Sequence, residues 1–333
     1  MPVTKSNVLY CGEYVPEMLI EAMKSFGTSI NGGWINAVQG VKPGAPHIMP
    51  KVGADVDPAE VYDCDLPVTT GTTYEERQLE VFKYMVVDQD CNDVFVNTMG
   101  RKAYADGGLA SIPESLLKDY VIAPITRQLG KQFGKAIWQA VSVGATPPAG
   151  SKLTDIFDGF ETQIVTNAPG ANVLTGQAAI TSANVLAELD AFLEHIEGIA
   201  NSEDWFYPAD NLTNANFPAV WVDKATWSKL KRMAYSADFK DMFDFGATSE
   251  AFVGSYKGYT IYADLLTEGT MIAGTAGEGG NFHVGVDATM NGEDSEFRVE
   301  PVPNTNKFQI DLADSVGTLV TLPSQVALRQ VAV

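Results

Sequence analysis

The most regular hydrophobic pattern of the chain lies between Ser111 and Ala140. Apolar residues recur there at every fourth position and so form one stripe along a helix; they are Leu117, Val121, Ile125, Leu129, Phe133 and Ile137. Ser111 and Glu114 have the spacing of a capping box. The pattern predicts a helix of about 45 Å if fully formed, with a kink at Pro124. Its length and narrow stripe favour a spine on which other elements are laid, while an ordinary core helix is the simpler interpretation.

Residues 31–72 are rich in glycine and proline, which break helices. Two segments between these breakers, at 48–52 and 61–66, are strand candidates, and the second alternates as a strand does. The stretch is too long for a plain connection, so we predict a protruding β-hairpin that a neighbouring molecule orders. Residues 1–30 hold one short amphipathic piece, at 17–26, and are predicted to be an extension that docks elsewhere.

The rest of the chain mixes helix and strand before it becomes almost entirely strand. A strand is predicted at 77–87 and a helix within 90–104. Further patterns predict helices at 155–165, from Thr181 or Ser182 to about residue 200, and at 224–235 after an Asp223 cap, with a buried strand at 217–222. The strands predicted from 252 onward are 259–262, 271–273, 282–286, 296–300, 307–311, 318–322 and 326–330. This order predicts an α+β protein that contains a small α/β layer domain.

The composition says more about possible binding partners than about the fold. The chain has 333 residues, which predicts two domains or one with large excursions. Its formal net charge is −20, so free nucleic acid and anionic membrane surfaces would be repelled. Cys11, Cys64 and Cys91 have no CxxC spacing and are expected to be reduced thiols of a cytoplasmic protein. We expect neither a secretory signal nor a membrane-spanning segment.

The candidates for catalysis or metal binding all lack part of the required pattern. His195 has no second histidine at the spacing of a zinc protease, and His283 lies in a predicted strand, so surface and structural roles are expected. The stretch 130–135 is one residue short of a phosphate-binding loop and lies in a predicted helix. Oxygen ligands at 287–294 have calcium-like spacing, but a solvated turn is the better interpretation. We therefore predict no enzyme activity and no cofactor.

Charge is distributed unevenly along the chain. The segment from Glu188 to Asp210 holds seven carboxylates and no Lys or Arg, and we interpret it as a solvated face. Residues 101–135 hold six basic and three acidic residues. Late in the predicted helix, Lys131 and Lys135 would complement the helix dipole; the alternative is a contact with an acidic neighbouring subunit.

Several short motifs occur in a definite order along the chain. They are Cys64-Asp65, Gly71-Thr72-Thr73, Ile112-Pro113-Glu114, Ala136-Ile137-Trp138-Gln139, Phe157-Asp158-Gly159-Phe160 and the segment Asn281 to Asp287. In these motifs and in the order of its elements, the chain resembles the major capsid proteins of tailed phages, especially phages of Bacteroidetes-type bacteria. The resemblance implies a Hong Kong 97-type fold.

The resemblance also implies a division of the chain. Residues 1–35 would be an N-terminal arm and 36–75 an extended β-hairpin loop. A peripheral domain with the spine helix would comprise 76–145 and 295–322, and an axial domain would comprise 146–294 and 323–333. The residues expected at subunit interfaces are Lys42, His47, Met49, Lys51, Arg127, Lys131 and Lys135.

The function that the resemblance implies is structural. Copies of the chain would assemble in the host cytoplasm into hexamers and pentamers of an icosahedral phage head. The virion would enclose double-stranded DNA without sequence-specific binding. The implied partners are further copies of the chain, a portal protein, and scaffold or decoration proteins, with no membrane partner. Two alternatives stay open: an encapsulin-like nanocompartment shell, and a cytoplasmic α/β enzyme that uses the layer at 146–240.

Overall fold

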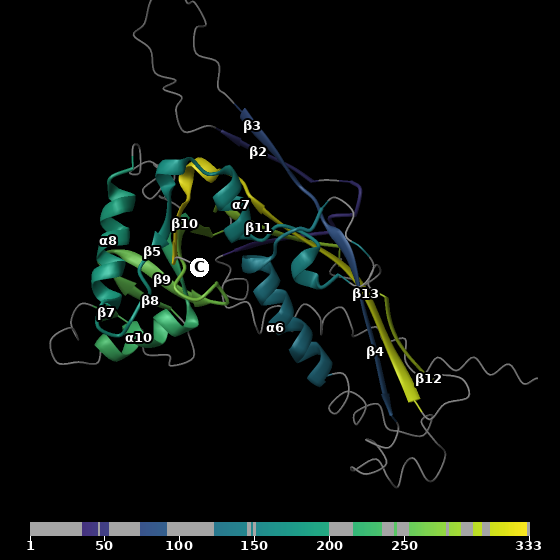
Figure 1. The fold of residues 1–333 in the computed structure, drawn as a ribbon. Helices are drawn as coiled ribbons and strands as arrows, with labels where there is room; N and C mark the ends of the chain where they lie inside the picture. The colour runs from purple at the N-terminus through teal and green to yellow at the C-terminus, as the bar shows by residue number, and fades with distance from the viewer. Residues whose placement is uncertain are drawn as a thin grey trace, which may run out of the picture.

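The structure is a computed structural model, and it describes residues 35–45, 47–52, 74–91, 123–144, 148, 151–199, 216–234, 243–244, 253–277, 280–287, 296–301 and 307–331. This part of the chain forms a seven-stranded sheet, a five-stranded sheet and a two-stranded hairpin (Figure 1). Its α-helices are α6 (Ala123–Gln139), α7 (Phe160–Asn167), α8 (Val185–Glu197) and α10 (Lys224–Ala234). Short 3-10 turns lie at Leu153–Asp155, Gly170–Asn172 and Pro323–Gln325. The mixed helix-and-sheet class predicted from the sequence is confirmed.

The seven-stranded sheet lies between two pairs of helices. Its strand order is β5 (Val173–Gln177), β14 (Ala327–Val331), β10 (Met271–Gly277), β6 (Asn216–Asp223), β9 (Tyr259–Asp264), β8 (Val253–Tyr256) and β7 (Phe243–Asp244). Successive side chains of a strand point to opposite faces. Accordingly, Trp221 of β6 packs in the cluster that holds α6 and α7, whereas its neighbour Val220 packs in the cluster that holds α8 and α10.

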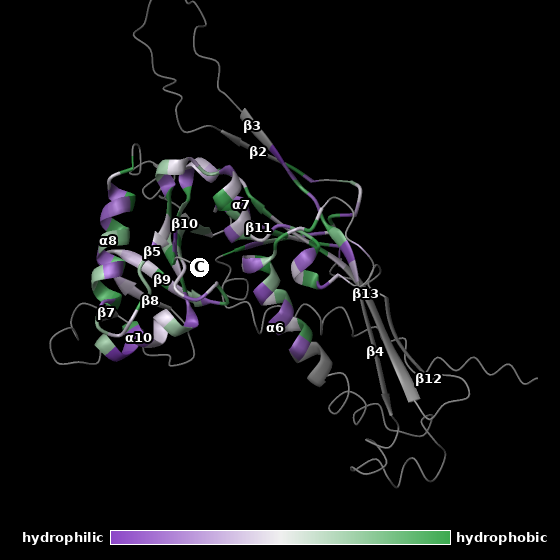
Figure 2. Ribbon diagram, in the orientation of Figure 1, coloured by the Kyte–Doolittle hydropathy of each residue, from purple (hydrophilic) through white to green (hydrophobic). Residues whose placement is uncertain are grey.

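The helices of this layer follow local sequence signals. The carboxylate of Asp223 accepts hydrogen bonds from the amides of Ala225 at 2.8 Å and Thr226 at 3.0 Å, which confirms the predicted cap of α10. α8 begins after Asn184, close to its predicted start. Apolar and polar residues alternate in bands along α8 and α6, as burial of one helix face requires (Figure 2).

The five-stranded sheet is built on one long strand, β13 (Lys307–Val320). Its first part is paired on both edges, by β12 (Glu296–Pro301) and by β4 (Phe82–Cys91). Its last part pairs with β11 (Phe282–Val286), which in turn pairs in parallel with β1 (Asn36–Gln39). The prediction of two separate strands at 307–311 and 318–322 was wrong, because the ladder with β4 continues unbroken from Lys307 to Val316.

Two further predictions need correction. The helix predicted at 155–165 begins at Phe160, because Gly159 before it is extended and packs against the end of α6. A side chain at Gly159 would lie 2.7 Å from the backbone carbonyl of Trp138. The strand predicted at 77–87 is interrupted after Leu79, so that β3 (Tyr74–Leu79) and β4 are distinct strands. The helix predicted within 90–104 lies outside the described residues, apart from two residues that end β4.

A cluster of four aromatic side chains joins the two large sheets. Trp138 of α6, Phe160 of α7, Trp221 of β6 and Phe282 of β11 are all buried. Their ring centroids lie 4.8 Å apart for Trp221–Phe282, 5.1 Å for Phe160–Phe282 and 5.2 Å for Trp138–Phe160. Edge-to-face pairs of this kind contribute about 0.5–1.5 kcal/mol each beyond the area they bury. Three of the short sequence motifs therefore supply rings to one core.

Candidate subunit interface

The predicted interface residues fall into two groups that the structure does not bring together. Lys42 and His47 are exposed near the base of the hairpin, and Met49 and Lys51 lie in its strand β2 (His47–Val52). Arg127, Lys131 and Lys135 lie on α6. Figure 1 shows the hairpin and α6 on different parts of the molecule.

Of the predicted hairpin, the structure describes the first strand, which pairs with a strand that the prediction did not include; the name hairpin is kept here for β2 and β3. β2 pairs antiparallel with β3, from His47 opposite Leu79 to Val52 opposite Tyr74. The predicted strand at 61–66 lies outside the described residues. Ile48 of β2 keeps 52% of its surface exposed. An exposed apolar residue on a projecting hairpin is the kind of position that a neighbouring molecule covers.

The root of the hairpin is fixed by a pair of glycines. Gly285 of β11 and Gly317 of β13 are opposite one another in the sheet, and the chain at 79–81 crosses directly over them. A side chain at Gly317 would lie 1.8 Å from the carbonyl oxygen of Glu80. Leu79 and Val81 are buried there in a small cluster with Val41 and Leu319. Sequence reasoning missed this contact, because nothing local to Gly317 shows which segment crosses it.

α6 has one buried and one exposed side over its described length. Leu129, Phe133 and Ile137 are buried as the sequence predicted, while Lys131 and Lys135 are exposed. The last turn of α6 contains no basic residue, so the predicted role of the two lysines at the carbonyl end of the helix was wrong. Pro124 is the second residue of α6, and the capping box at 111–114 lies outside the described residues.

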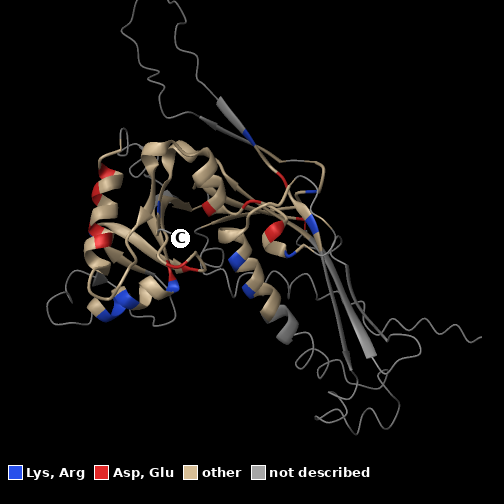
Figure 3. Ribbon diagram, in the orientation of Figure 1, with Lys and Arg blue, Asp and Glu red and all other residues tan. Residues whose placement is uncertain are grey.

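Two acidic residues of α8, Glu188 and Asp190, are half-buried and contact the sheet, so for them the interpretation as a solvated face was wrong. Glu194 and Glu197 are exposed as predicted, and the remainder of the acidic segment lies outside the described residues. Glu188 pairs with the buried Arg329 of β14, with Oε2 and Nη2 2.5 Å apart. Asp190 accepts hydrogen bonds from the hydroxyl of Tyr256 at 2.8 Å and from Lys257 at 2.7 Å. Burial, together with this carboxylate, raises the pKa of Tyr256 to about 12. Figure 3 shows several acidic positions along the ribbon of α8.

The two candidate histidines, His195 and His283, lie in different environments. His195 is half-buried on α8, not at the surface as predicted, and its Nε2 atom is buried. His283 is buried in β11, with Nε2 3.0 Å from the carbonyl oxygen of Gly280, which fits the structural role predicted for it. Most of the calcium-like segment 287–294 lies outside the described residues. Among the residues that the structure describes, no three His, Cys, Asp or Glu side chains gather as metal ligands would.

The loop that follows β9, residues 265–270, is held by four different elements. Gln139 of α6 donates to the carbonyl of Leu265 at 2.6 Å, and the amide of Thr267 donates to Glu161 of α7 at 2.7 Å. The amide of Gly269 donates to the Asp223 carboxylate at 2.9 Å, and its carbonyl accepts from Arg329 at 3.0 Å. This loop therefore ties α6 and α7 to the sheet.

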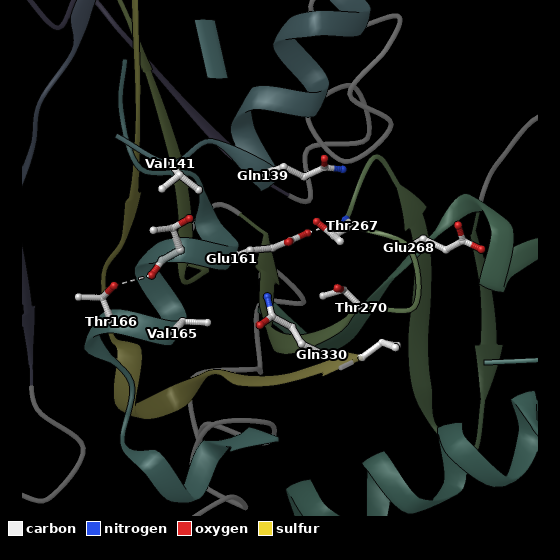
Figure 4. Close-up of a pocket in the computed structure, with 11 residues that line it drawn as sticks. Gln139, Val141, Glu161, Val165, Thr166, Thr267, Glu268, Thr270 and Gln330 are labelled. Carbon is white, nitrogen blue, oxygen red and sulfur yellow. Dashed lines mark hydrogen bonds between the residues drawn. The ribbon is translucent and has the colours of Figure 1, made fainter. Parts of the chain in front are cut away.

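A hollow of about 410 Å³ lies beside this loop. Its lining includes Gln139, Val141, Glu161, Val165 and Thr267, and Figure 4 shows Glu161 directed toward Thr267. Glu161 is only 5% exposed, and burial raises the pKa of its carboxyl group. Hydroxyl and amide groups surround this carboxylate, and apolar valines lie at the edge of the hollow.

No helix among the described segments has both the length and the apolar character needed to cross a bilayer. No protein-family model matches the chain, and no curated protein matches it in sequence. Solved structures do match. A chain of the satellite phage P4 procapsid, which includes a size determination protein, aligns at a TM-score of 0.54 with 13% identity, covering 95% of this chain and 99% of the other. The fold is that of phage capsid chains.

Other solved structures show the same likeness. A chain from the capsid of the native GTA particle aligns at a TM-score of 0.51 with 12% identity, covering 92% of this chain and 91% of the other. A chain of Mycobacterium phage Bobi aligns at 0.50 with 12% identity, covering 92% of this chain and 91% of the other. At such identities the capsid-type fold is shared, while the sequence has diverged almost completely.

Proposed function

We propose that this chain is a major capsid protein. Many copies would form the hexamers and pentamers of an icosahedral phage head, in the virion, after assembly in the host cytoplasm. The observation that carries the proposal is the capsid-chain fold over nearly the whole length of both aligned chains.

The shape of the subunit supports a role in assembly. The hairpin β2–β3 and the long strands β4, β12 and β13 extend away from the helix-covered sheet (Figure 1). Projections with little core of their own gain stability when they lie on a neighbour, at about 25 cal/mol for each Å² of apolar surface buried. We propose that the arm at 1–35 and the loop at 36–75 overlap adjacent copies, that 76–145 with 295–322 form the peripheral domain, and that 146–294 with 323–333 form the axial domain.

The interface residues fit this proposal in different ways. Lys42, His47, Met49 and Lys51 would act from the hairpin, whereas Arg127, Lys131 and Lys135 would act from α6. The net charge of −20 suits a wall that encloses DNA without holding it, because an acidic inner surface does not trap the sliding duplex. A portal protein and scaffold or decoration proteins would be further partners.

An encapsulin-like shell is the second candidate. A chain of the holo-SrpI encapsulin complex from Synechococcus elongatus aligns at a TM-score of 0.49, with 8% identity over 89% of this chain. A cytoplasmic α/β enzyme is a weaker third candidate, since the hollow beside the 265–270 loop offers no recognised nucleophile or metal cluster among its described residues.

Electron microscopy of the purified protein tests the proposal. Capsomers, tubes or closed particles are expected, and a uniformly small monomer at all protein and salt concentrations would contradict it. Particles recovered from the native host are then treated with nuclease. Protected double-stranded DNA supports a phage head, whereas an enclosed enzyme with no protected DNA supports the nanocompartment.

A further inference from the structure

The hollow beside the 265–270 loop is where exposed apolar side chains gather. Among the described residues, the exposed large apolar side chains are Ile48 on the hairpin and Val141, Val143 and Val165. Val141 and Val165 line the hollow, and Val143 lies two residues from Val141. Exposed apolar groups that cluster around a concavity mark a surface that something covers.

Glu161 places a carboxylate in this hollow without a cation. Thr267 donates to it from its amide at 2.7 Å and from its side chain, and no Lys or Arg among the described residues forms an ion pair with it. The charge of Asp223, which is also negative, adds to the rise of the Glu161 pKa that burial causes. Lys229 lies 4.0 Å from Glu268 at the edge of the hollow, but its ammonium already donates to the carbonyl of Ile180 at 2.7 Å.

The residues of the hollow match the chemistry of a lysine side chain. Val141 and Val165 offer apolar surface to a four-carbon stem, and Glu161 offers a carboxylate to the ammonium at its end. The polar atoms of Gln139, Thr162 and Thr267 lie around the same space and include further acceptors for an ammonium group.

The net charge of the chain indicates where that lysine comes from. Subunits that each carry a charge of −20 repel one another. A cation of one copy that meets a carboxylate of the next offsets part of this repulsion. The exposed Lys131 and Lys135 on α6 form no ion pair with a described residue and are available for such a contact.

We propose that the hollow receives a lysine side chain of a second copy of this chain, with the stem between Val141 and Val165 and the ammonium on Glu161. This inference rests on the proposed shell function and adds one specific contact between neighbouring subunits. The pairing turns a buried, uncompensated carboxylate into a site that is satisfied only in the assembly.

The test compares assembly of the wild type with Glu161→Gln and a matched control, Glu194→Gln. The side-chain amide introduced by Glu161→Gln keeps an acceptor for Thr267 and removes the charge. Glu194 is an exposed carboxylate of α8 that does not line the hollow. Light scattering gives the protein concentration at which assembly begins. We expect Glu161→Gln to raise it at least tenfold, as loss of a desolvated charge partner does, and Glu194→Gln to leave it unchanged.

A second measurement identifies the contact directly and does not depend on any variant folding. Isotopically labelled and unlabelled wild-type protein are mixed, assembled and treated with a water-soluble carbodiimide, which joins a carboxylate to an adjacent amine. Mass spectrometry should find the Glu161 peptide joined to a lysine peptide of the other isotope.

The outcomes separate the two proposals. If the wild type assembles while Glu161→Gln assembles at the same concentration and no such cross-link forms, the hollow is not the lysine site and the shell function stands. If the wild type forms no assembly, the shell function is contradicted and the inference falls with it.

Discussion

Replacing Gly317 by alanine tests whether the glycine pair fixes the root of the hairpin. The new methyl group would lie 1.8 Å from the carbonyl oxygen of Glu80 and 3.2 Å from the α-carbon of Val81. Non-bonded carbon and oxygen atoms stay about 3.3 Å apart, so the crossing segment has to move by about 1.5 Å. The contacting atoms belong to the backbone, and rotation of a side chain cannot relieve the overlap.

The size of the effect follows from what the crossing segment buries. Leu79 is 0% and Val81 is 4% exposed. Full exposure of both would cost about 3–6 kcal/mol, whereas overpacking that neighbours absorb costs about 1–3 kcal/mol. We therefore expect Gly317→Ala to lower the free energy of unfolding by about 3 kcal/mol.

Urea unfolding of the unassembled protein measures this change. Gly170→Ala is the matched control, because a methyl group there meets nothing within 4 Å and the backbone is not in the left-handed region. The control should stay within about 0.5 kcal/mol of the wild type. Equal stability of the two variants would contradict the close packing of residues 79–81 over Gly317.

Three further predictions concern the core, the hollow and the hairpin. Leu129→Asp places an unpaired charge at a buried position of α6 and should unfold the subunit. An unchanged circular dichroism melting curve would show that residue 129 is not buried in the core. Because burial raises the folded-state pKa of Glu161 above 4.5, its contribution to stability is greatest below the unfolded-state pKa and falls as pH rises through the folded-state value. Urea midpoints of the wild type, taken relative to Glu161→Gln, should therefore fall between acidic and neutral pH, and a pH-independent difference would argue against this reasoning. Deletion of 42–58 removes β2 and should leave the two large sheets folded but abolish assembly in electron micrographs; shells at wild-type yield would contradict the role of the hairpin.

Signals within a few residues of sequence were sufficient to predict an amphipathic helix, a helix cap and a buried strand. The four-residue period in α6 correctly gave Leu129, Phe133 and Ile137 as buried, and Asp223 was recognisable as a cap. The strand β6 was predicted from its apolar run. In each case the determining interactions lie within a few residues of one another in the sequence.

Interactions between distant segments were not predictable in the same way. Gly159 is compatible with a helix until the end of α6 is packed against it, and Gly317 resembles a strand break until β4 pairs along β13. Glu188 and Asp190 of α8 look like parts of a solvated face, because their partners Arg329 and Tyr256 lie far away in the sequence. The Glu161 hollow gave no sequence signal at all, since its lining comes from segments up to 192 positions apart, from residue 139 to residue 331.

The aromatic cluster has a consequence for synthesis of the protein. Its rings come from positions 138, 160, 221 and 282, so the cluster stays incomplete on the ribosome until the last of them has left the exit tunnel. Long-range contacts of this kind delay folding. A nascent chain that ends before β11 exposes the apolar side of α6 to every other nascent copy nearby. If the chain is made in many copies as proposed, unfinished chains would need shielding until each monomer is complete.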